Sequence, residues 1–231
     1  MQRDKDETFK KDLYKFADQI VTSEFDFLKE CKSICVCGNG PDDYAKGVSN
    51  KLIEQHDVVV RMNSYKLVPE ISGTKTTFHF IGSINRRFHT DEKNHPVFPH
   101  KNQCDYIISN QNQEFNQKLE EEVKPTVPVI KIKTSLIHEL IKEKIIKKKY
   151  RINMTGVFAL LLFKAIQVKY QIPKFSIFGM GGHKLVNNNQ QYYYGNRKLD
   201  AGKARFHEKS HFWKLQEILV DLFKKHHFLN K

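Results

Sequence analysis

Two short apolar segments with a helical segment between them constrain the fold of this 231-residue chain more than any other feature. Residues 33–37 form a short apolar run that stops at a glycine-rich turn, and residues 57–63 form a β-branched run that ends in polar groups. Residues 44–55 between them can form a helix. We therefore expect a β-α-β unit, in which two parallel strands share one sheet.

The rest of the chain continues this alternation. Further strands are expected at residues 76–81, 106–109, 125–133 and 174–178, and helices at residues 9–28, 136–149, 157–166 and 208–225. The helix at 157–166 is apolar nearly all round, which predicts burial, and Thr155 suits its N-cap. The alternation predicts the α/β class, as a single Rossmann-like domain with a mostly parallel sheet covered on both faces. We expect an N-terminal amphipathic helix packed on the core, residues 1–30, and one domain, residues 31–231.

Composition and charge narrow the functional classes without choosing among them. Hydrophobic residues make up 39% and charged residues 28% of the chain, which is enough apolar material for a globular protein. The formal net charge of +13 predicts attraction to polyanions, such as nucleic acid, an anionic membrane or phosphate-bearing substrates. A non-catalytic nucleic-acid-binding protein is therefore one hypothesis. Against it, the sequence has no recognition-helix module or RNA-binding signature, and its basic residues are spread over several segments.

Signals for a membrane span, a metal site or disulfides are weak. No stretch approaches the roughly 18 apolar residues of a membrane span, and the N-terminus lacks the apolar core of a signal peptide, so we expect a cytoplasmic protein. The four cysteines lack the spacing of a zinc site, and we expect reduced thiols, with Cys35 and Cys37 buried on one side of a strand. Asp42 and Asp43 are adjacent and have no third ligand nearby, so we expect no required metal.

Polar residues follow both strands of the β-α-β unit. Gly38, Asn39, Gly40 and Pro41 come directly after the first strand, and Asn63 ends the second. These residues would lie at the carboxyl edge of a parallel sheet, where open α/β folds bind their ligands. The turn is neither a GxGxxG fingerprint nor a P-loop, so a plain turn is an equal alternative. Asn63 could hydrogen-bond a ribose or base, or could tie down a loop.

Three other segments carry groups suited to phosphate chemistry. Thr155 and Gly156 open an apolar helix whose amides and dipole favour an anion, although an ordinary helix cap explains them as well. Tyr192, Tyr193 and Tyr194 could donate phenolic hydrogen bonds to a departing phosphate. The alternative is that they are packing anchors of a loop. His207 precedes the last predicted helix, whose dipole favours the neutral, proton-accepting imidazole of a general base. A surface histidine is the alternative in a chain with 11 of them.

In their order along the chain, these segments resemble the motifs of the sialyltransferases, both the bacterial enzymes and the animal enzymes with their sialylmotifs. Residues 35–41 resemble the opening nucleotide loop, and residues 56–63 resemble the strand that ends in Arg-x-Asn. Residues 154–161 resemble the helix that starts with Ser/Thr-Gly, and residues 175–179 resemble the strand that follows it.

The terminal motif extends this resemblance. His207, with Glu217 ten residues further on, resembles the motif that holds the family's general base. Position 212 is Phe, so the His-x4-Glu spacing of the animal enzymes is not met, and the assignment follows the bacterial pattern. The resemblance implies one GT-A-like catalytic domain over residues 31–231, which lacks a metal-binding Asp-x-Asp motif and inverts the anomeric centre in one displacement.

The resemblance also implies a role for each matching residue. The implied substrate-binding residues are Gly38, Asn39, Gly40, Pro41, Asn63, Thr155, Gly156 and Gly179, and the implied catalytic residues are His207, Tyr192, Tyr193 and Tyr194. Asn39 and Asn63 would contact the CMP moiety. Thr155 and Gly156 would contact the donor carboxylate or phosphate. One or two of the tyrosines would contact the leaving phosphate, and His207 would deprotonate the acceptor hydroxyl.

We therefore predict an inverting glycosyltransferase that transfers sialic acid, or a related ulosonic acid such as Kdo, from a CMP-sugar donor to a hydroxyl of a glycan or glycolipid. The CMP-sugar is a substrate rather than a cofactor, and no nucleic acid partner is expected. The basic segment at residues 224–228 could rest on an anionic membrane that carries a lipid-linked acceptor. A nucleotide-binding methyltransferase is a third alternative, but it needs an acidic residue where this chain has Asn63.

Overall fold

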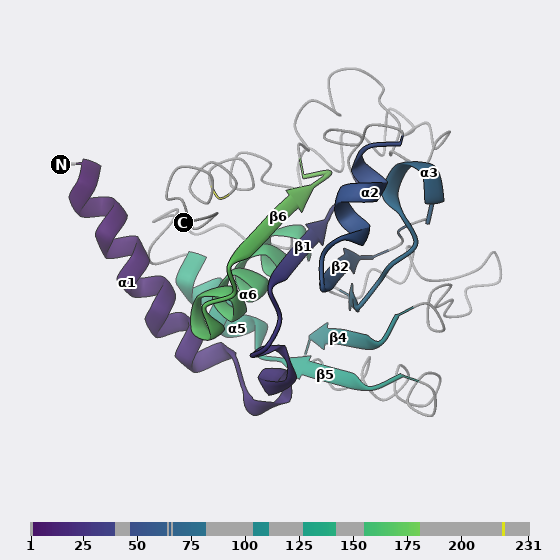
Figure 1. Ribbon diagram of the computed structural model, residues 1–231. Helices are drawn as coiled ribbons and strands as arrows, with labels where there is room; N and C mark the ends of the chain where they lie inside the picture. The colour runs from purple at the N-terminus through teal and green to yellow at the C-terminus, as the bar shows by residue number, and fades with distance from the viewer. Residues whose placement is uncertain are drawn as a thin grey trace, which may run out of the picture.

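The structure is a computed structural model, and it describes residues 2–39, 47–63, 65, 67–81, 104–110, 127–141, 155–180 and 219. In this part of the chain the centre is a six-stranded sheet with the order β5-β4-β3-β2-β1-β6 (Figure 1). The strands are β1 (Ser33–Cys37), β2 (Val58–Met62), β3 (Phe78–Ile81), β4 (Tyr106–Asn110), β5 (Val129–Ile132) and β6 (Lys174–Phe178). Every neighbouring pair is parallel, which confirms the predicted α/β class.

The central strands form because most of their residues are apolar, on both faces of the sheet. Every residue of β1 and of β2 is buried. A parallel strand that is covered on both faces appears in the sequence as a continuous apolar run. For this reason β1 has the bounds expected from the sequence, residues 33–37. β6 also has the expected bounds, residues 174–178, although it is an edge strand in which only Phe175 is fully buried.

Helices cover both faces of this sheet. On one face lie α1 (Gln2–Ile20), α5 (Thr134–Leu140) and α6 (Thr155–Tyr170), and on the other lie α2 (Ser49–Glu54) and α3 (Pro69–Ser72). Ile34 and Val36 of β1 join the large apolar core with α6, which is buried along most of its length as expected. Cys35 and Cys37 point the other way and pack with Ile53 of α2, and their sulfur atoms lie 3.5 Å apart without a disulfide between them.

The helix expected at residues 9–28 is divided into two elements. α1 ends at Ile20, and a 3₁₀-helix, η1 (Ser23–Leu28), follows it. The break lies at Thr22, whose backbone is extended with φ −84° and ψ 173°. The apolar stripe is nevertheless buried in both parts, as Leu13 in α1 and Phe25 in η1 show. Neither α1 nor any other helix in the described ranges is both long and apolar enough to cross a lipid bilayer.

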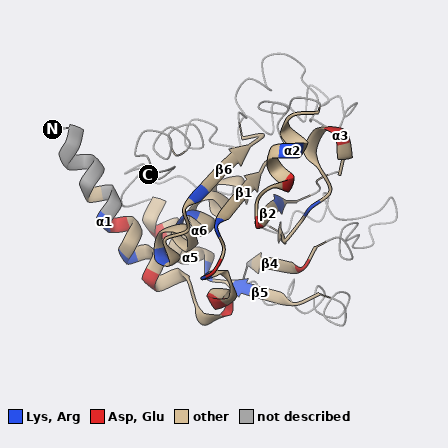
Figure 2. Cartoon of the chain, in the orientation of Figure 1, with Lys and Arg blue, Asp and Glu red and all other residues tan. Residues whose placement is uncertain are grey.

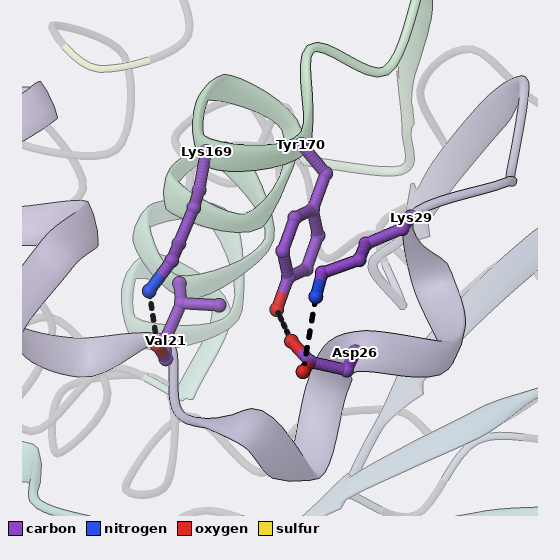
Figure 3. A network of polar contacts seen from close by, with 5 residues as sticks. All are labelled: Val21, Asp26, Lys29, Lys169 and Tyr170. Carbon is purple, nitrogen blue, oxygen red and sulfur yellow. Dashed lines mark hydrogen bonds and ion pairs between the residues drawn. The ribbon is translucent and has the colours of Figure 1, made fainter.

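Polar contacts tie η1 to the last turn of α6 (Figure 3). The Tyr170 hydroxyl donates to Asp26 Oδ1 at 2.9 Å, and Lys29 Nζ lies 3.0 Å from Asp26 Oδ2. These bonds, first that of Lys29 and then that of Tyr170, lower the pKa of Asp26. Lys169 Nζ donates to the carbonyl of Val21 at 2.6 Å. Because η1 leads into β1, the end of α6 is held at the edge of the sheet where the strands begin.

Several expected elements fall on residues outside the described ranges. They include residues 142–149, the basic segment at 224–228, and the last helix at 208–225 apart from Leu219. Leu219 is helical and fully buried. The division of the chain into residues 1–30 and 31–231 stays a prediction.

Candidate functional site

The ends of β1 and β2 bring two asparagines onto neighbouring strands. Cys37, the last residue of β1, pairs with Arg61 of β2, so Asn39 and Asn63 each stand two residues beyond that pair. The Asn39 side-chain amide donates from Nδ2 to the main-chain oxygen of Met62 at 3.2 Å. This bond joins the turn after β1 to the end of β2.

The other polar atom of the Asn39 amide is an open acceptor. Asn39 is half-buried, and its Oδ1 is shielded from solvent and has no hydrogen-bond partner in the described part of the chain. A buried acceptor without a donor costs about 1–3 kcal/mol. A ligand N–H or O–H that reached Oδ1 would remove this cost, so the atom is suited to binding a polar ligand.

Gly38 holds the ends of β1 and β6 together. Its N–H donates to the carbonyl of Phe178 at 2.8 Å. A Cβ added at Gly38 would lie 2.2 Å from the carbonyl oxygen of Gly179 and 2.5 Å from Met180 Sδ, so only glycine fits there. Gly179 has a φ of 64°, in the left-handed region that glycine adopts readily. The two glycines expected at the site therefore meet where β1 and β6 end.

This meeting point is the topological switch point of the sheet. From β1 the strand order runs through β2, β3 and β4 to β5 on one side, whereas β6 lies on the other side of β1. Open α/β sheets bind their ligands outside the carboxyl ends of the strands at such a point. The turn that begins with Gly38 and Asn39 therefore starts at the position where a ligand is expected.

Asn63 lies in a tight turn after β2 that is tied to β3. Its φ is 53°, a left-handed conformation that Asn tolerates better than most residues. Its N–H donates to the carbonyl of Phe80 at 3.0 Å, and its own carbonyl accepts a bond from the N–H of Tyr65 at 3.1 Å. His79 Nε2 lies 2.8 Å from the same carbonyl oxygen. The sequence reasoning missed His79 and Tyr65, although a histidine between two phenylalanines of a strand was a signal.

Arg61, two residues before Asn63, belongs to the interior. It is fully buried on the face covered by α2 and α3. Its guanidinium donates to the Ser72 carbonyl at 2.6 Å, and its Nε lies 3.1 Å from both the Lys75 carbonyl and Thr76 Oγ1. The two residues of the Arg-x-Asn pattern therefore have different positions. Asn63 lies at the edge of the sheet, whereas Arg61 anchors the loop before β3.

Thr155 and Gly156 begin α6 near the same edge of the sheet. The last turn of α6 is held where the strands begin, so the helix is antiparallel to the strands and its first turn lies toward their carboxyl ends. In that turn Phe158 packs edge-on against His138 of α5, with ring centroids 4.8 Å apart, and α5 directly follows β5. Both Thr155 and Gly156 are half-buried. Amides at the start of this 16-residue helix favour a bound anion.

The remaining predicted site residues lie outside the described ranges. They are Gly40, Pro41, Tyr192, Tyr193, Tyr194 and His207. Asp42 and Asp43 lie outside these ranges as well. Among the residues that the structure describes, no group of three or more His, Cys, Asp or Glu side chains is placed to hold a metal ion.

Known structures share this architecture, although no protein-family model and no curated protein sequence matches the chain. A mammalian sialyltransferase matches with a TM-score of 0.51 and 17% identity, over 93% of this chain and 75% of that one. A mammalian sialyltransferase in complex with Gal-beta-1-3GalNAc-ortho-nitrophenol matches with a TM-score of 0.50, at the same identity and coverage. The alpha-2,3-sialyltransferase of Campylobacter jejuni in apo form is more distant, with a TM-score of 0.37 and 14% identity over 89% of this chain and 75% of that one.

The two mammalian structures establish the fold. The chain has a sialyltransferase-like α/β architecture, in which one parallel sheet is flanked by helices. The fold class that the sequence predicts, a Rossmann-like domain of the GT-A-like variant, is therefore confirmed.

Proposed function

We propose that this chain is a glycosyltransferase of the sialyltransferase type, which takes an acidic sugar from a CMP-linked donor. The observation that carries the proposal is the placement of Asn39 and Asn63 on neighbouring strand ends, at the switch point of a sheet with a sialyltransferase-like fold. The motifs that contain these two residues resemble those that contact CMP in the family. Sialic acid is the first sugar to test and Kdo the second.

The donor is proposed to bind along the carboxyl edge of the sheet. Asn39 Oδ1, which is buried and lacks a donor in the described part of the chain, accepts a hydrogen bond from a ribose hydroxyl or from the amino group of cytosine. Asn63 contacts the same nucleotide from the next strand. The amides of Thr155 and Gly156, at the positive end of the α6 dipole, bind the carboxylate or phosphate of the donor.

The proposed reaction is a single displacement assisted by a base. His207 takes the proton of the acceptor hydroxyl while the acceptor oxygen bonds to the anomeric carbon. The bond between that carbon and the phosphate oxygen breaks, and CMP leaves with the electron pair, so the anomeric configuration inverts. Hydrogen bonds from one or two of Tyr192, Tyr193 and Tyr194 stabilise the charge on the leaving phosphate. This scheme requires no metal.

A glycan or glycolipid hydroxyl is the proposed acceptor. The mammalian sialyltransferase with Gal-beta-1-3GalNAc-ortho-nitrophenol makes that disaccharide the first acceptor to test. If the acceptor is lipid-linked, the basic segment at residues 224–228 would bring the enzyme to an anionic membrane. Cosedimentation with anionic vesicles should then fall as salt rises, and the absence of any salt-sensitive binding would exclude the membrane contact.

The central experiment measures CMP release from CMP-sialic acid in EDTA-containing buffer with a panel of glycan acceptors. We expect His207→Ala to lose most of the rate while still binding CMP, and His211→Ala, the next histidine along the chain, to stay active. We expect Asn39→Ala to bind CMP more weakly. If the wild type neither binds nor turns over any CMP-sugar, the proposal fails.

Nucleic-acid binding is the second candidate, because the net charge is +13. In the described part of the chain Lys and Arg lie on several elements, among them α1, α2 and β5, and acidic residues lie among them (Figure 2). A nucleic-acid-binding protein would bind DNA or RNA with an affinity that falls steeply as salt rises. This binding is measured in the same preparation if no CMP-sugar binds.

A further inference from the structure

We propose that His79 is a positioning residue for the candidate nucleotide site, and that it acts by holding the turn that carries Asn63. This inference rests on the proposed function, because it concerns the same site. His79 lies in β3, is 1% exposed, and pairs in register with Arg61 of β2. Its ring therefore lies on the face covered by α2 and α3, one strand away from the turn that it contacts.

The contact between His79 and Asn63 is a hydrogen bond of fixed direction. Nε2 of His79 lies 2.8 Å from the main-chain oxygen of Asn63, and since a carbonyl oxygen only accepts, Nε2 carries the hydrogen. The N–H of Asn63 donates to the carbonyl of Phe80. Both peptide groups of Asn63 are thus tied to β3, one through the main chain of Phe80 and the other through the side chain of His79.

The turn at Asn63 needs such a tie because its backbone is in the left-handed region, with φ 53°. Non-glycine residues adopt that region at a cost in free energy, so the turn tends to relax toward an extended conformation when its hydrogen bonds are lost. Without the His79 donor, the Asn63 carbonyl would lose a hydrogen bond that acts beside the one from the N–H of Tyr65. Relaxation of φ would change the direction of the Asn63 side chain at the edge of the sheet, and the nucleotide would lose the contact proposed for it.

Packed rings fix the orientation of His79. The Tyr65 ring, which is 3% exposed, stands edge-on to the His79 ring with centroids 5.0 Å apart and planes at 85°. Arg61 Cζ lies 5.7 Å from the centroid of the Tyr65 ring on the same buried face. The chain of contacts from Arg61 through Tyr65 to His79 therefore connects the buried cation to the turn at the edge of the sheet.

Two substitutions separate the donor of His79 from its ring. His79→Phe keeps an aromatic ring against Tyr65 and removes the donor, whereas His79→Gln keeps a donor and removes the ring. We expect His79→Phe to weaken CMP binding about tenfold in isothermal titration, and His79→Gln to stay within about twofold of the wild type. In an Asn63→Gly background, which tolerates the positive φ, His79→Phe should have no further effect on CMP affinity.

His56 supplies a matched control at the opposite edge of the sheet. It is also 1% exposed and lies just before β2, where Nδ1 is 2.8 Å from the Leu52 carbonyl and Nε2 is 2.8 Å from Ser176 Oγ. His56→Phe should lower thermal stability and leave CMP affinity unchanged. Hydrogen exchange of the ligand-free proteins adds a readout that needs no nucleotide: the Tyr65 amide should exchange faster in His79→Phe than in His56→Phe.

The outcomes separate this inference from the proposed function. The positioning role is refuted if His79→Phe binds CMP like the wild type, if His56→Phe weakens binding as much, or if His79→Gln binds more than fivefold more weakly. The last criterion holds even if His79→Phe fails to fold. If the wild type does not bind CMP, the proposed function fails, and unchanged exchange of the Tyr65 amide in His79→Phe would then refute the role of His79 in the turn as well.

Discussion

The lysine buried in the middle of α6 should make the stability of this protein depend on pH above neutrality. Lys164 is 0% exposed. Its Nζ donates a hydrogen bond to Gln167 Oε1 and lies 4.9 Å from the centroid of the Phe175 ring. Burial lowers the pKa of Lys164 to about 7. The folded state therefore favours the neutral amine, and folding at neutral or mildly alkaline pH releases a proton.

The size of the effect follows from the two pKa values. With an ordinary value of about 10.4 in the unfolded chain and about 7 in the fold, burial of Lys164 costs on the order of 4 kcal/mol at pH 7. At pH 9 the cost falls to on the order of 2 kcal/mol, because each pH unit between the two pKa values is worth up to about 1.4 kcal/mol. The penalty vanishes only above the unfolded pKa, so stability should rise between about pH 7 and pH 10.

Lys164→Met tests this reasoning, because methionine has a similar length and no charge. We expect the variant to be more stable than the wild type at pH 7 by about 2–3 kcal/mol, since the loss of the donor to Gln167 offsets about 1–2 kcal/mol of the gain. At pH 9 the advantage should shrink by about 2 kcal/mol. The measurement is urea unfolding at the two pH values, compared with Lys169→Met on the same helix.

The pH dependence, rather than the absolute stability, decides the result. Lys169 is half-exposed and donates to the carbonyl of Val21, so Lys169→Met should change with pH in parallel with the wild type. If Lys164→Met also changes in parallel with the wild type between pH 7 and pH 9, Lys164 is charged in the folded protein and the reasoning is wrong.

Two further predictions concern the edge of the sheet and the opposite end of β2. Gly38→Ala should lower the free energy of unfolding by about 2 kcal/mol and abolish CMP binding, because its Cβ would lie 2.2 Å from the carbonyl oxygen of Gly179. If the variant unfolds and binds CMP like the wild type, the two chain segments do not approach this closely. Burial lowers the pKa of His56 below 6.5, so the neutral ring stabilises the fold above that pH and the stabilisation is lost as pH falls through the lowered value. His56→Gln should therefore lose less stability than the wild type between pH 7 and pH 5 in urea unfolding, and an equal loss would contradict the neutral ring.

Much of the fold is predictable because its central strands are buried on both faces. A strand that packs on both sides needs a nearly unbroken apolar run, and β1 carries such a run. The break between α1 and η1 was not foreseen, because the apolar spacing continues from Ile20 to Phe25 across Thr22. Helical periodicity reports which side of a segment is buried, and it does not report a change of backbone conformation that leaves the burial intact.

The site was predictable only where the residues that form it follow strand ends. Asn39 and Asn63 stand out in the sequence because each ends an apolar run, and parallel pairing then places them on neighbouring strands. His79 could not be assigned in this way, because its contact with Asn63 depends on the register between β2 and β3. A shift of one residue would turn the ring of His79 to the other face of the sheet, and no local pattern fixes that register.

The buried position of Arg61 argues against it as a source of positive charge for the proposed CMP-linked donor. The guanidinium is fully buried and donates to Ser72, Lys75 and Thr76, so it stabilises the loop before β3 rather than an anion at the edge. Withdrawing it toward a phosphate would leave the carbonyls of that loop without donors in a buried place, at a cost of about 1–3 kcal/mol for each. Within the described part of the chain, the first turn of α6 is the better place for a donor phosphate, because Thr155 and Gly156 offer amides there and the helix dipole supplies a partial positive charge. On this argument Thr155→Pro, which removes one of those amides, should weaken the binding of CMP more than that of cytidine, whereas equal losses for the two ligands would place the phosphate elsewhere.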